Sequence, residues 1–222
     1  SIQQKLNERQ IVTKKSYDLS TGVELGKFIP EKVGISLPMY FSQTEGKITP
    51  KYNPLDPDIL LNELLDNNDF SQEYRDSVGF RTEEYMKRKS INFTNVRKLR
   101  PKGQTKAHFY DVSNLSFNFG YSNSYMRNAE TQFDTKKNYK GGIAYGFSNN
   151  PKNYTPFSDS KIGKKKAFTF IKDFNFYLAP KQLTFQTDVD RMYSERRARN
   201  NTGFAFEMPT YYQKYFYWNR VY

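Results

Sequence analysis

Cysteine is absent from the sequence and histidine occurs once, at His108, and each scarcity excludes a class of chemistry. A chain without cysteine has no disulfide framework and no thiolate nucleophile. A single histidine excludes a paired-histidine metal site and leaves any Ser-His-Asp arrangement dependent on one residue. We therefore expect a protein that is not an enzyme and that uses no metal or cofactor.

Long apolar runs are missing as well. No window approaches the ~20 apolar residues that a membrane helix needs, so any crossing of a membrane would be made by strands. Branched aliphatic side chains are scarce, whereas 18 Tyr and 19 Phe supply much of the apolar area. Aromatic-rich nucleic-acid binders, extracellular β-proteins and outer-membrane barrels share this composition.

The formal net charge is +12, from 35 Lys and Arg against 23 Asp and Glu. An excess of this size makes a polyanion a reasonable partner, such as lipopolysaccharide, nucleic acid or an acidic client protein. The same charge also suits loops and water-facing strand surfaces that bind nothing. Charge alone leaves both interpretations open.

Alternation of apolar and polar side chains is the clearest structural signal, and it runs through residues 115–125, 139–147 and 183–189. Odd positions there are mostly aromatic or aliphatic, and even positions are small or polar. Residues 168–178 show the same alternation with apolar even positions. A period of two places each set on one face of a sheet. The pattern predicts an antiparallel sheet of about eight to ten strands, apolar on one face only.

Matching phases on either side of a turn predict two hairpins, in residues 17–41 and 173–195. Between their turns, near Pro30 and Pro180, five strands are counted. The two turns are therefore expected on opposite sides of a membrane, unless a connection hides another strand. The predicted pairs are Leu25–Ile35 and Val23–Leu37 in the first hairpin, and Leu178–Leu183 and Phe176–Phe185 in the second.

Residues 44–90 interrupt the alternation, and their proline-rich stretch cannot lie in a central ladder because proline lacks the backbone donor. A helix is predicted to begin at Asp56, with Pro57 at its first position, and a second helical segment near residues 70–78. The segment is either a docking or plug-like insertion at one rim or a packed connection without a partner. The predicted organisation is one sheet over residues 1–222, interrupted by this partly helical insertion.

No catalytic constellation emerges from the charged residues. On a strand, His108 and Asp111 would point to opposite faces, so His108 is interpreted as a loop or interfacial residue. Asp188 and Asp190 share a face, but nothing distinguishes an acid–base pair from two water-facing charges. Residues 141–142, a Gly-Gly pair, lie inside a predicted strand, where they would allow close packing or a bend.

Several stretches resemble the SprA/Sov family, the giant outer-membrane proteins of gliding motility and type IX secretion in Bacteroidota. They are residues 49–58 (TPKYNPLDPD), 88–98 (RKSINFTNVRK), the stretch 173–195 and residues 218–220 (WNR). The resemblance implies a segment from the C-terminal part of a much longer chain. The resemblance implies no catalytic residue in this chain.

The family resemblance also implies a function and a set of partners. Its members form a protein-conducting channel through which folded cargo crosses the bacterial outer membrane. They work with a PorV-type barrel, a periplasmic plug and other translocon subunits. The expected partners are therefore the rest of the same large barrel chain, these subunits, secreted cargo proteins, and outer-membrane lipid with lipopolysaccharide.

The fold class that follows is all-β, a transmembrane antiparallel β-barrel segment with a short helical insertion. In such a wall the apolar face contacts lipid or a partner barrel, and the polar face lines a hydrated lumen. The residues assigned to lipid or a partner are Leu115, Phe117, Phe119, Tyr121, Ile143, Tyr145, Phe147, Phe174, Phe176, Leu178, Leu183, Phe185 and Val189. Those assigned to the lumen are Ser116, Asn118, Gly120, Lys140, Gly142, Gly146, Asn175, Gln186, Asp188 and Asp190.

Three other interpretations remain, and one of them is a barrel enzyme, which would lose its activity when His108 is replaced by Ala. A complete small porin-like barrel would pair Tyr222 with residues 1–15. A soluble, basic, aromatic-rich β-protein could stack bases along a groove. This last interpretation is disfavoured, and no nucleic-acid partner is expected, because the rings alternate over many strands rather than cluster at a few stacking positions.

Overall fold

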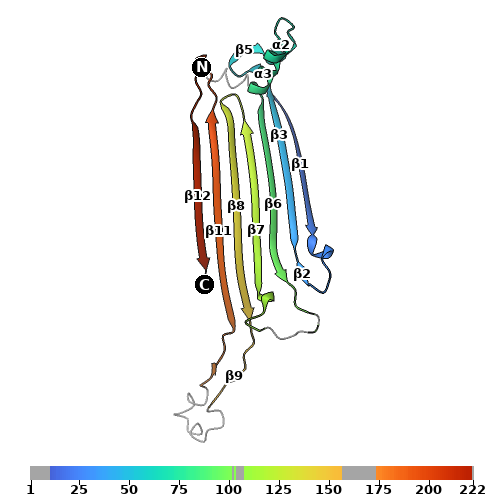
Figure 1. Ribbon diagram of the computed structural model, residues 1–222, viewed down its shortest axis with the longest axis vertical. Helices are drawn as coiled ribbons and strands as arrows, with labels where there is room; N and C mark the ends of the chain where they lie inside the picture. The colour runs from blue at the N-terminus through green and yellow to red at the C-terminus, as the bar shows by residue number, and fades with distance from the viewer. Residues whose placement is uncertain (1–10, 102, 104–107, 157–173, 222) are drawn as a thin grey trace.

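The computed structural model describes residues 11–101, 103, 108–156 and 174–221. Its main feature is one antiparallel sheet of eight strands, in the order β1-β3-β6-β7-β8-β11-β12, with the short strand β2 paired to β6. The long strands lie side by side, and the helices gather at one end of the sheet (Figure 1). The fold is mostly β with two short α-helices, which confirms the predicted antiparallel sheet and its helical interruption.

The elements have the following bounds. The large sheet contains β1 (Val12–Glu24), β2 (Ile35–Ser36), β3 (Pro38–Pro50), β6 (Glu84–Lys98), β7 (Leu115–Arg127), β8 (Thr131–Ser148), β11 (Gln182–Ala198) and β12 (Thr210–Val221). Two small ladders join β4 (Tyr52–Asn53) to β5 (Asp56–Leu60) and β9 (Asn153–Tyr154) to β10 (Phe176–Tyr177). The helices are α2 (Leu61–Asp66) and α3 (Gln72–Thr82), with 3-10 turns η1 (Leu25–Phe28) and η2 (Val112–Asn114).

The tight connection between β7 and β8 shows how local chemistry sets the register of the sheet. The Asn128 side-chain Oδ1 accepts hydrogen bonds from the backbone N–H groups of Glu130 and Thr131, at 3.0 and 2.7 Å. An asparagine that bonds the backbone two and three residues ahead mimics a turn and stabilises it. The strands that leave this turn pair continuously as far as Leu115 opposite Tyr145.

The first predicted hairpin forms, but its register differs by two residues. Val23 lies opposite Met39, not Leu37, so each side chain keeps its predicted face. The Glu24 carboxylate accepts from the backbone N–H groups of Gly26 and Leu37, which closes the 3-10 turn at the end of β1. Ile35 consequently leaves the hairpin and pairs with Lys98 of β6.

The second predicted hairpin, within residues 173–195, is wrong. β11 pairs with β8, so Leu183 lies opposite Phe147, while Phe176 of β10 lies opposite Tyr154 of β9. β8 pairs with β11 along almost its whole length, with its apolar positions from Tyr139 to Phe147 in phase with those of β11, and this ladder is far longer than one within the predicted hairpin. The apolar positions expected between 168 and 173 lie outside the described residues.

The predicted positions of the two turns also need correction. β3, β6, β7 and β8 are the long strands between the turn near Pro30 and the connection near Pro180. This even number puts both connections at the same end of the sheet, opposite the helices (Figure 1). The fifth strand of the prediction was the first arm of the incorrect hairpin.

The helical insertion is narrower than residues 44–90, because β3 continues to Pro50 and β6 begins at Glu84. The stretch from Asp56, predicted as a helix start, is the strand β5, and α2 begins five residues later at Leu61. The Leu61 N–H donates to the Lys51 carbonyl at 3.0 Å, which holds the two ends of this small ladder together. The second predicted helix is confirmed as α3, and the Ser71 hydroxyl caps it by accepting from Tyr74 N at 3.3 Å.

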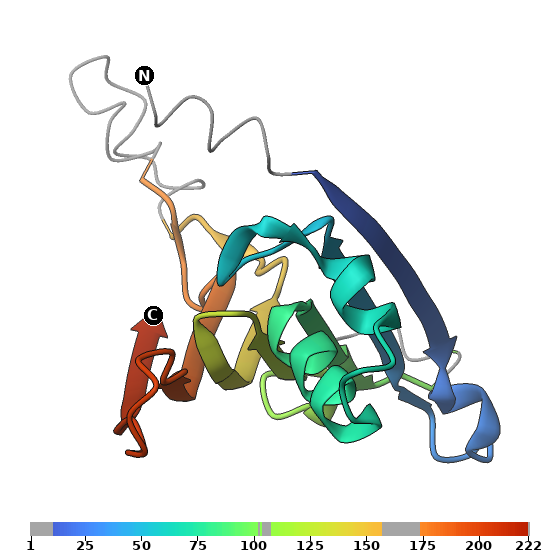
Figure 2. The ribbon, with the colours of Figure 1, turned by 90° about the horizontal axis from the view of Figure 1, so that it is seen from above.

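The large sheet has no second layer among the described residues. Only Leu61 and Phe147 are buried apolar side chains in that part of the chain, at 1% and 8% exposure. β1 and β12 are its edge strands, each hydrogen-bonded to one described neighbour. Seen from above, the helices lie over the end of the sheet (Figure 2), and Figure 1 shows that they leave the length of the strands uncovered. Neither helix, within the described ranges, has the length and apolarity required to span a membrane.

Candidate functional site

The strand register brings apolar side chains from seven strands onto one face. Phe119 lies opposite Phe93 of β6 and Gly141 of β8, and Gly141 lies opposite Val189 of β11, which pairs in turn with Trp218 of β12. Many of these rings and aliphatic chains are exposed. We call the following residues the apolar band: Val23, Met39, Phe41, Ile91, Phe93, Leu115, Phe117, Phe119, Tyr121, Tyr139, Ile143, Tyr145, Phe147, Leu183, Phe185, Val189, Phe216 and Trp218.

The opposite face, which we call the polar face, is hollowed. A depression of about 450 Å³ crosses β6, β7, β8, β11 and β12 near the middle of the sheet. Its polar lining includes Asn92, Asn118, Lys140, Asp188, Asp190 and Asn219.

Two glycines of β7 and β8 let side chains from neighbouring strands lie flat across the floor of this hollow. A Cβ atom at Gly142 would come 2.5 Å from the Asp188 Oδ1 atom, and one at Gly120 would come 2.9 Å from the Asn92 Oδ1 atom. Asp188 and Asn92 therefore occupy the space where the glycines have no side chain. Because Gly120 and Gly142 have no Cβ atom, the polar face is hollowed at these positions, and polar side chains from the neighbouring strands lie in the space.

The charges in the hollow are largely paired. Lys140 Nζ lies 3.2 Å from Asp190 Oδ2, and the Gln186 side-chain N–H donates to Asp188 Oδ2 at 2.7 Å. Both members of the ion pair are exposed, so it adds at most about 1 kcal/mol to stability. Together these groups form a solvent-exposed surface of mixed charge. Within the described ranges no group of three or more His, Asp or Glu could hold a metal ion.

The predicted face assignments agree with the geometry of the sheet for most residues. Every residue predicted to line a lumen lies on the polar face except Asn175, which precedes β10 outside the large sheet. Every residue predicted to contact lipid lies on the face of the apolar band except Phe174, Phe176 and Leu178, which lie in the same outlying segment. What each face contacts remains a prediction.

His108 lies in the connection between β6 and β7 and belongs to no candidate active site in the described part of the chain. Its backbone N–H donates to Asp111 Oδ2 at 2.8 Å, and its ring stacks on Tyr110 with 5.1 Å between centroids. The segment is a turn, so the expected separation of His108 and Asp111 on opposite faces of a strand does not apply. His108 is a loop residue, as predicted.

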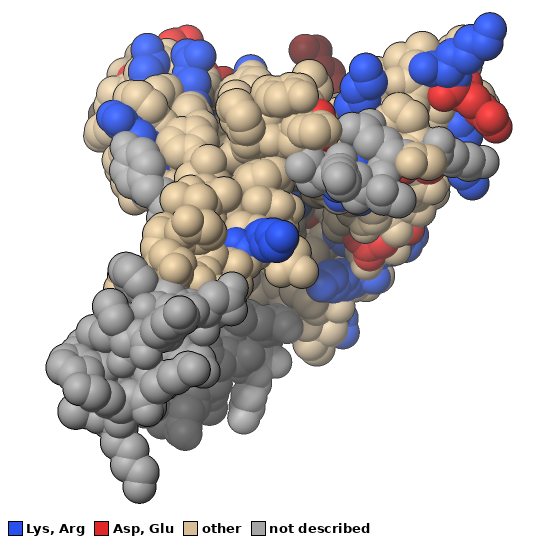
Figure 3. Space-filling view, turned by 90° about the horizontal axis from the view of Figure 1, so that it is seen from below, with Lys and Arg blue, Asp and Glu red and all other residues tan. Residues whose placement is uncertain are grey.

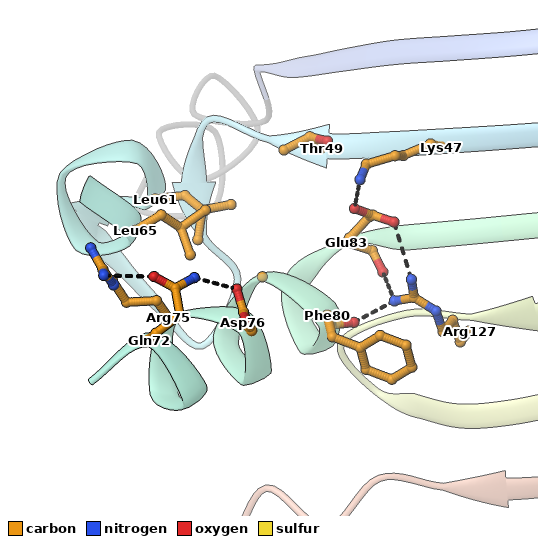
Figure 4. Close-up of a pocket in the computed structure, with 11 residues that line it drawn as sticks. Lys47, Thr49, Leu61, Leu65, Gln72, Arg75, Asp76, Phe80, Glu83 and Arg127 are labelled. Atoms are coloured by element: carbon orange, nitrogen blue, oxygen red, sulfur yellow. Dashed lines mark hydrogen bonds and ion pairs between the residues drawn. The ribbon is translucent and has the colours of Figure 1, made fainter. Parts of the chain in front are cut away.

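A second hollow, of about 470 Å³, lies between the helices and the end of the sheet (Figure 4). Arg127 from the end of β7 organises one side of it. Its guanidinium lies 3.1 Å from the Glu83 carboxylate, donates to the Phe80 carbonyl and stacks 3.7 Å from the Phe80 ring centroid. Glu83 also pairs with Lys47 of β3. Because Arg127 is only 8% exposed, this network fixes α3 to the sheet.

Arg199, which follows β11, lies near this end of the sheet. Partial burial lowers the pKa of Arg199, and the positive charges of Arg81 and Arg127 lower it further. An arginine remains protonated at neutral pH even so. One of its terminal nitrogens, Nη2, is buried without a hydrogen-bond partner among the described residues. Arg81, Arg127 and Arg199 thus bring three positive charges close together at this end of the sheet.

Sequence reasoning missed a cluster centred on Glu45. The hydroxyls of Tyr17 and Tyr85 donate to its two carboxylate oxygens at 2.6 and 2.7 Å, and Lys87 Nζ lies 2.9 Å away. These residues come from β1, β3 and β6, and they meet only through the observed strand register. They lie beyond the apolar band, on the same face and toward the helices.

Positive charge is spread over the end opposite the helices. In the view from below, Lys and Arg side chains stand in several separate places, with acidic side chains among them (Figure 3). A groove that tracks a nucleic-acid backbone requires a continuous basic stripe, which is not visible in this view.

Comparison with known proteins identifies one family. The family model SprA_N, described as a motility related/secretion protein, matches residues 1–65, which include β1, β3 and the start of α2. No curated protein matches the chain. The match covers the resembling stretch 49–58, whereas the resemblances at 88–98, 173–195 and 218–220 lie beyond it and remain predictions. Residues 1–65 are thus similar to a domain of motility and secretion proteins.

Proposed function

We propose that this chain forms part of the wall of a protein-conducting channel in the bacterial outer membrane, through which folded cargo passes in type IX secretion and gliding motility. The observation that carries the proposal is a single antiparallel sheet with an apolar face that no described layer covers. The family similarity of residues 1–65 to motility and secretion proteins supports the same conclusion.

The surface area of the molecule argues against a compact globular domain. Its accessible surface is 17,025 Å², whereas a compact protein of 26.3 kDa exposes ~10,600 Å² by the usual scaling of area with mass. Exposed side chains of the apolar band, such as Phe216 and Trp218, contribute to this area. Exposed apolar surface of this extent marks contact with a membrane or another protein.

The height of the apolar band suits a bilayer. On β8 the band extends from Tyr139 to Phe147, which is about 27 Å of extended strand and about 21 Å at a strand tilt of 40°. Outer-membrane barrels carry an outward apolar band ≈ 25 Å tall. Since β8 has 18 residues and a membrane strand needs ≈ 9–11, its end toward the helices projects from the bilayer.

The polar face would line the passage. Its amides and paired charges would face the passage together with exposed tyrosines such as Tyr217. The edge strands β1 and β12 would pair with the rest of the same large barrel chain. A PorV-type barrel, a periplasmic plug and other translocon subunits complete the proposed assembly.

The absence of cysteine allows a direct test by single-cysteine substitution. Ala144 and Gln186 face each other on the polar face, and their sequence neighbours Ile143 and Thr187 face each other on the apolar face. Cysteine at Ala144 or Gln186 should react with a membrane-impermeant maleimide and crosslink to cargo during secretion. Cysteine at Ile143 or Thr187 should do neither. Equal labelling of both pairs, or cargo crosslinks from the apolar pair, would contradict the proposal.

A further inference from the structure

On β6, β7 and β8 the apolar band ends at a row of polar residues on its side toward the helices, and on β11 Arg191 already lies between Tyr139 and Phe216. One register step beyond Tyr121 and Tyr139, the row contains Lys89 of β6 and Lys137 of β8, with Asn123 of β7 between them. Lys214 of β12 continues the row beyond Tyr193 of β11. We call Lys89, Lys137 and Lys214 the lysine row.

The charges of the lysine row are not neutralised within the described part of the chain. Lys89 and Lys214 are exposed, Lys137 is half-buried, and none of the three forms an ion pair with a described residue. Lys214 instead has its Nζ 6.0 Å from the centroid of the Tyr193 ring. By contrast, Lys87, one step further along, is paired with Glu45.

The spacing of the row suits a layer of separate anionic groups. Neighbouring strands lie about 4.8 Å apart, and the three lysines occupy alternate strands, so their backbones are separated by about 10 Å. The aliphatic stems of lysines can lie along an apolar surface while their amino groups reach the polar boundary. Tyr125, Tyr193 and Tyr212 lie in or next to the row, and tyrosines favour the boundary between hydrocarbon and water.

We propose that the lysine row binds the phosphates of anionic lipid headgroups and so marks the membrane boundary on the helical side of the sheet. This inference rests on the proposed function, because it requires the apolar band to lie in hydrocarbon. Charge complementarity and direct continuity with the apolar band identify the occupant as a lipid. An acidic protein segment would not need an apolar surface of bilayer height beside it.

The chain provides a matched control on the other face. Arg88 and Lys136 immediately precede Lys89 and Lys137, lie at the same height and also flank a single β7 residue, Ser124, but point to the polar face. The double variants Lys89→Gln/Lys137→Gln and Arg88→Gln/Lys136→Gln therefore remove equal charge at equal height. Only the first removes charge beside the apolar band.

The experiment measures lipid preference of the membrane-inserted protein. Protein is inserted into phosphatidylcholine vesicles that contain phosphatidylglycerol, extracted gently, and its retained lipids are quantified by mass spectrometry. The unmodified protein should enrich phosphatidylglycerol, and the enrichment should weaken with rising salt. Each lysine near an anionic surface strengthens binding about fivefold, so Lys89→Gln/Lys137→Gln should lower the enrichment roughly 30-fold. The Arg88→Gln/Lys136→Gln variant should retain it, as should Lys89→Arg/Lys137→Arg.

The outcomes separate this inference from the proposed function. Insertion into vesicles without phosphatidylglycerol enrichment, or equal loss in both glutamine variants, would overturn the lipid site and leave the membrane wall intact. Failure of the unmodified protein to insert into any vesicle would overturn both. If the glutamine variant does not fold, the salt dependence of the unmodified protein and the arginine variant still decide the question.

Discussion

An arginine placed at Ile143 should destabilise the membrane-inserted protein far more than one placed at Ala144. Ile143 lies in the middle of the apolar band, opposite Phe117 on one side and Thr187 on the other, and its side chain is 40% exposed. Ala144 is the next residue of the same strand and lies on the polar face between Ser116 and Gln186. The two substitutions share strand, height and added side chain.

The expected magnitude follows from the depth of Ile143 in the band. An arginine on the lipid face at the bilayer midplane costs ≈ 2–4 kcal/mol, which corresponds to roughly 30- to 1,000-fold in the folding equilibrium. At Ala144 the guanidinium would reach water and cost under about 1 kcal/mol. Urea titration of the protein in vesicles, followed by β-sheet circular dichroism, gives both values. Equal destabilisation by the two variants, or a larger effect at Ala144, would refute the assignment of the faces.

Two further predictions concern the ends of the sheet. Arg127→Lys keeps the charge but loses the forked contact with Glu83 and the stacking on Phe80, so proteolysis within residues 67–71 should become faster while the sheet signal is unchanged. Protection equal to that of the original protein would contradict the anchoring role. Gly26→Ala places a Cβ against the Ile35 carbonyl oxygen, closer than van der Waals contact allows, and should destabilise the β1–β3 hairpin by about 1–3 kcal/mol in urea titration. Gly141→Ala meets no atom within 4 Å and serves as the control; equal effects would refute the steric argument.

The face of the sheet on which each strand residue lies could be predicted from the sequence, because it depends only on the two-residue period of a β-strand. Alternation assigns Phe117, Ile143 and Val189 to one face whatever their partners are, and the observed register keeps that assignment. Partner choice could not be predicted in the same way. Leu183 is in phase with both Leu178 and Phe147, and only the length of the β8–β11 ladder decides between them.

The helical insertion shows a different limit of sequence reasoning. Asp56 and Pro57 have the residue types of a helix start, but their backbone is held in β5 by pairing with β4. The start of α2 coincides instead with burial of Leu61, a contact that depends on the tertiary fold. Tertiary contacts commonly override local propensity in this way.

The lysine row and the Glu45 cluster carry no sequence signal at all. Their members are separated by tens of residues and meet across three or more strands, so they appear only when the register is known. Alternation places Lys137 and its neighbour Lys136 on opposite faces, but only the register shows that Lys137 lies in line with Lys89 and Lys214. Composition alone could show only the excess of positive charge.

Fluorescence of Trp218, the only tryptophan in this chain, tests most directly whether the apolar face contacts lipid. Trp218 is 53% exposed in the apolar band opposite Val189, and its neighbour Asn219 lies on the polar face opposite Asp188. In vesicles, lipids with brominated acyl chains should quench Trp218, and aqueous iodide should not. In the variant Trp218→Phe/Asn219→Trp the preference should reverse. Iodide quenching of Trp218 with no effect of the brominated chains would contradict a membrane-facing apolar surface.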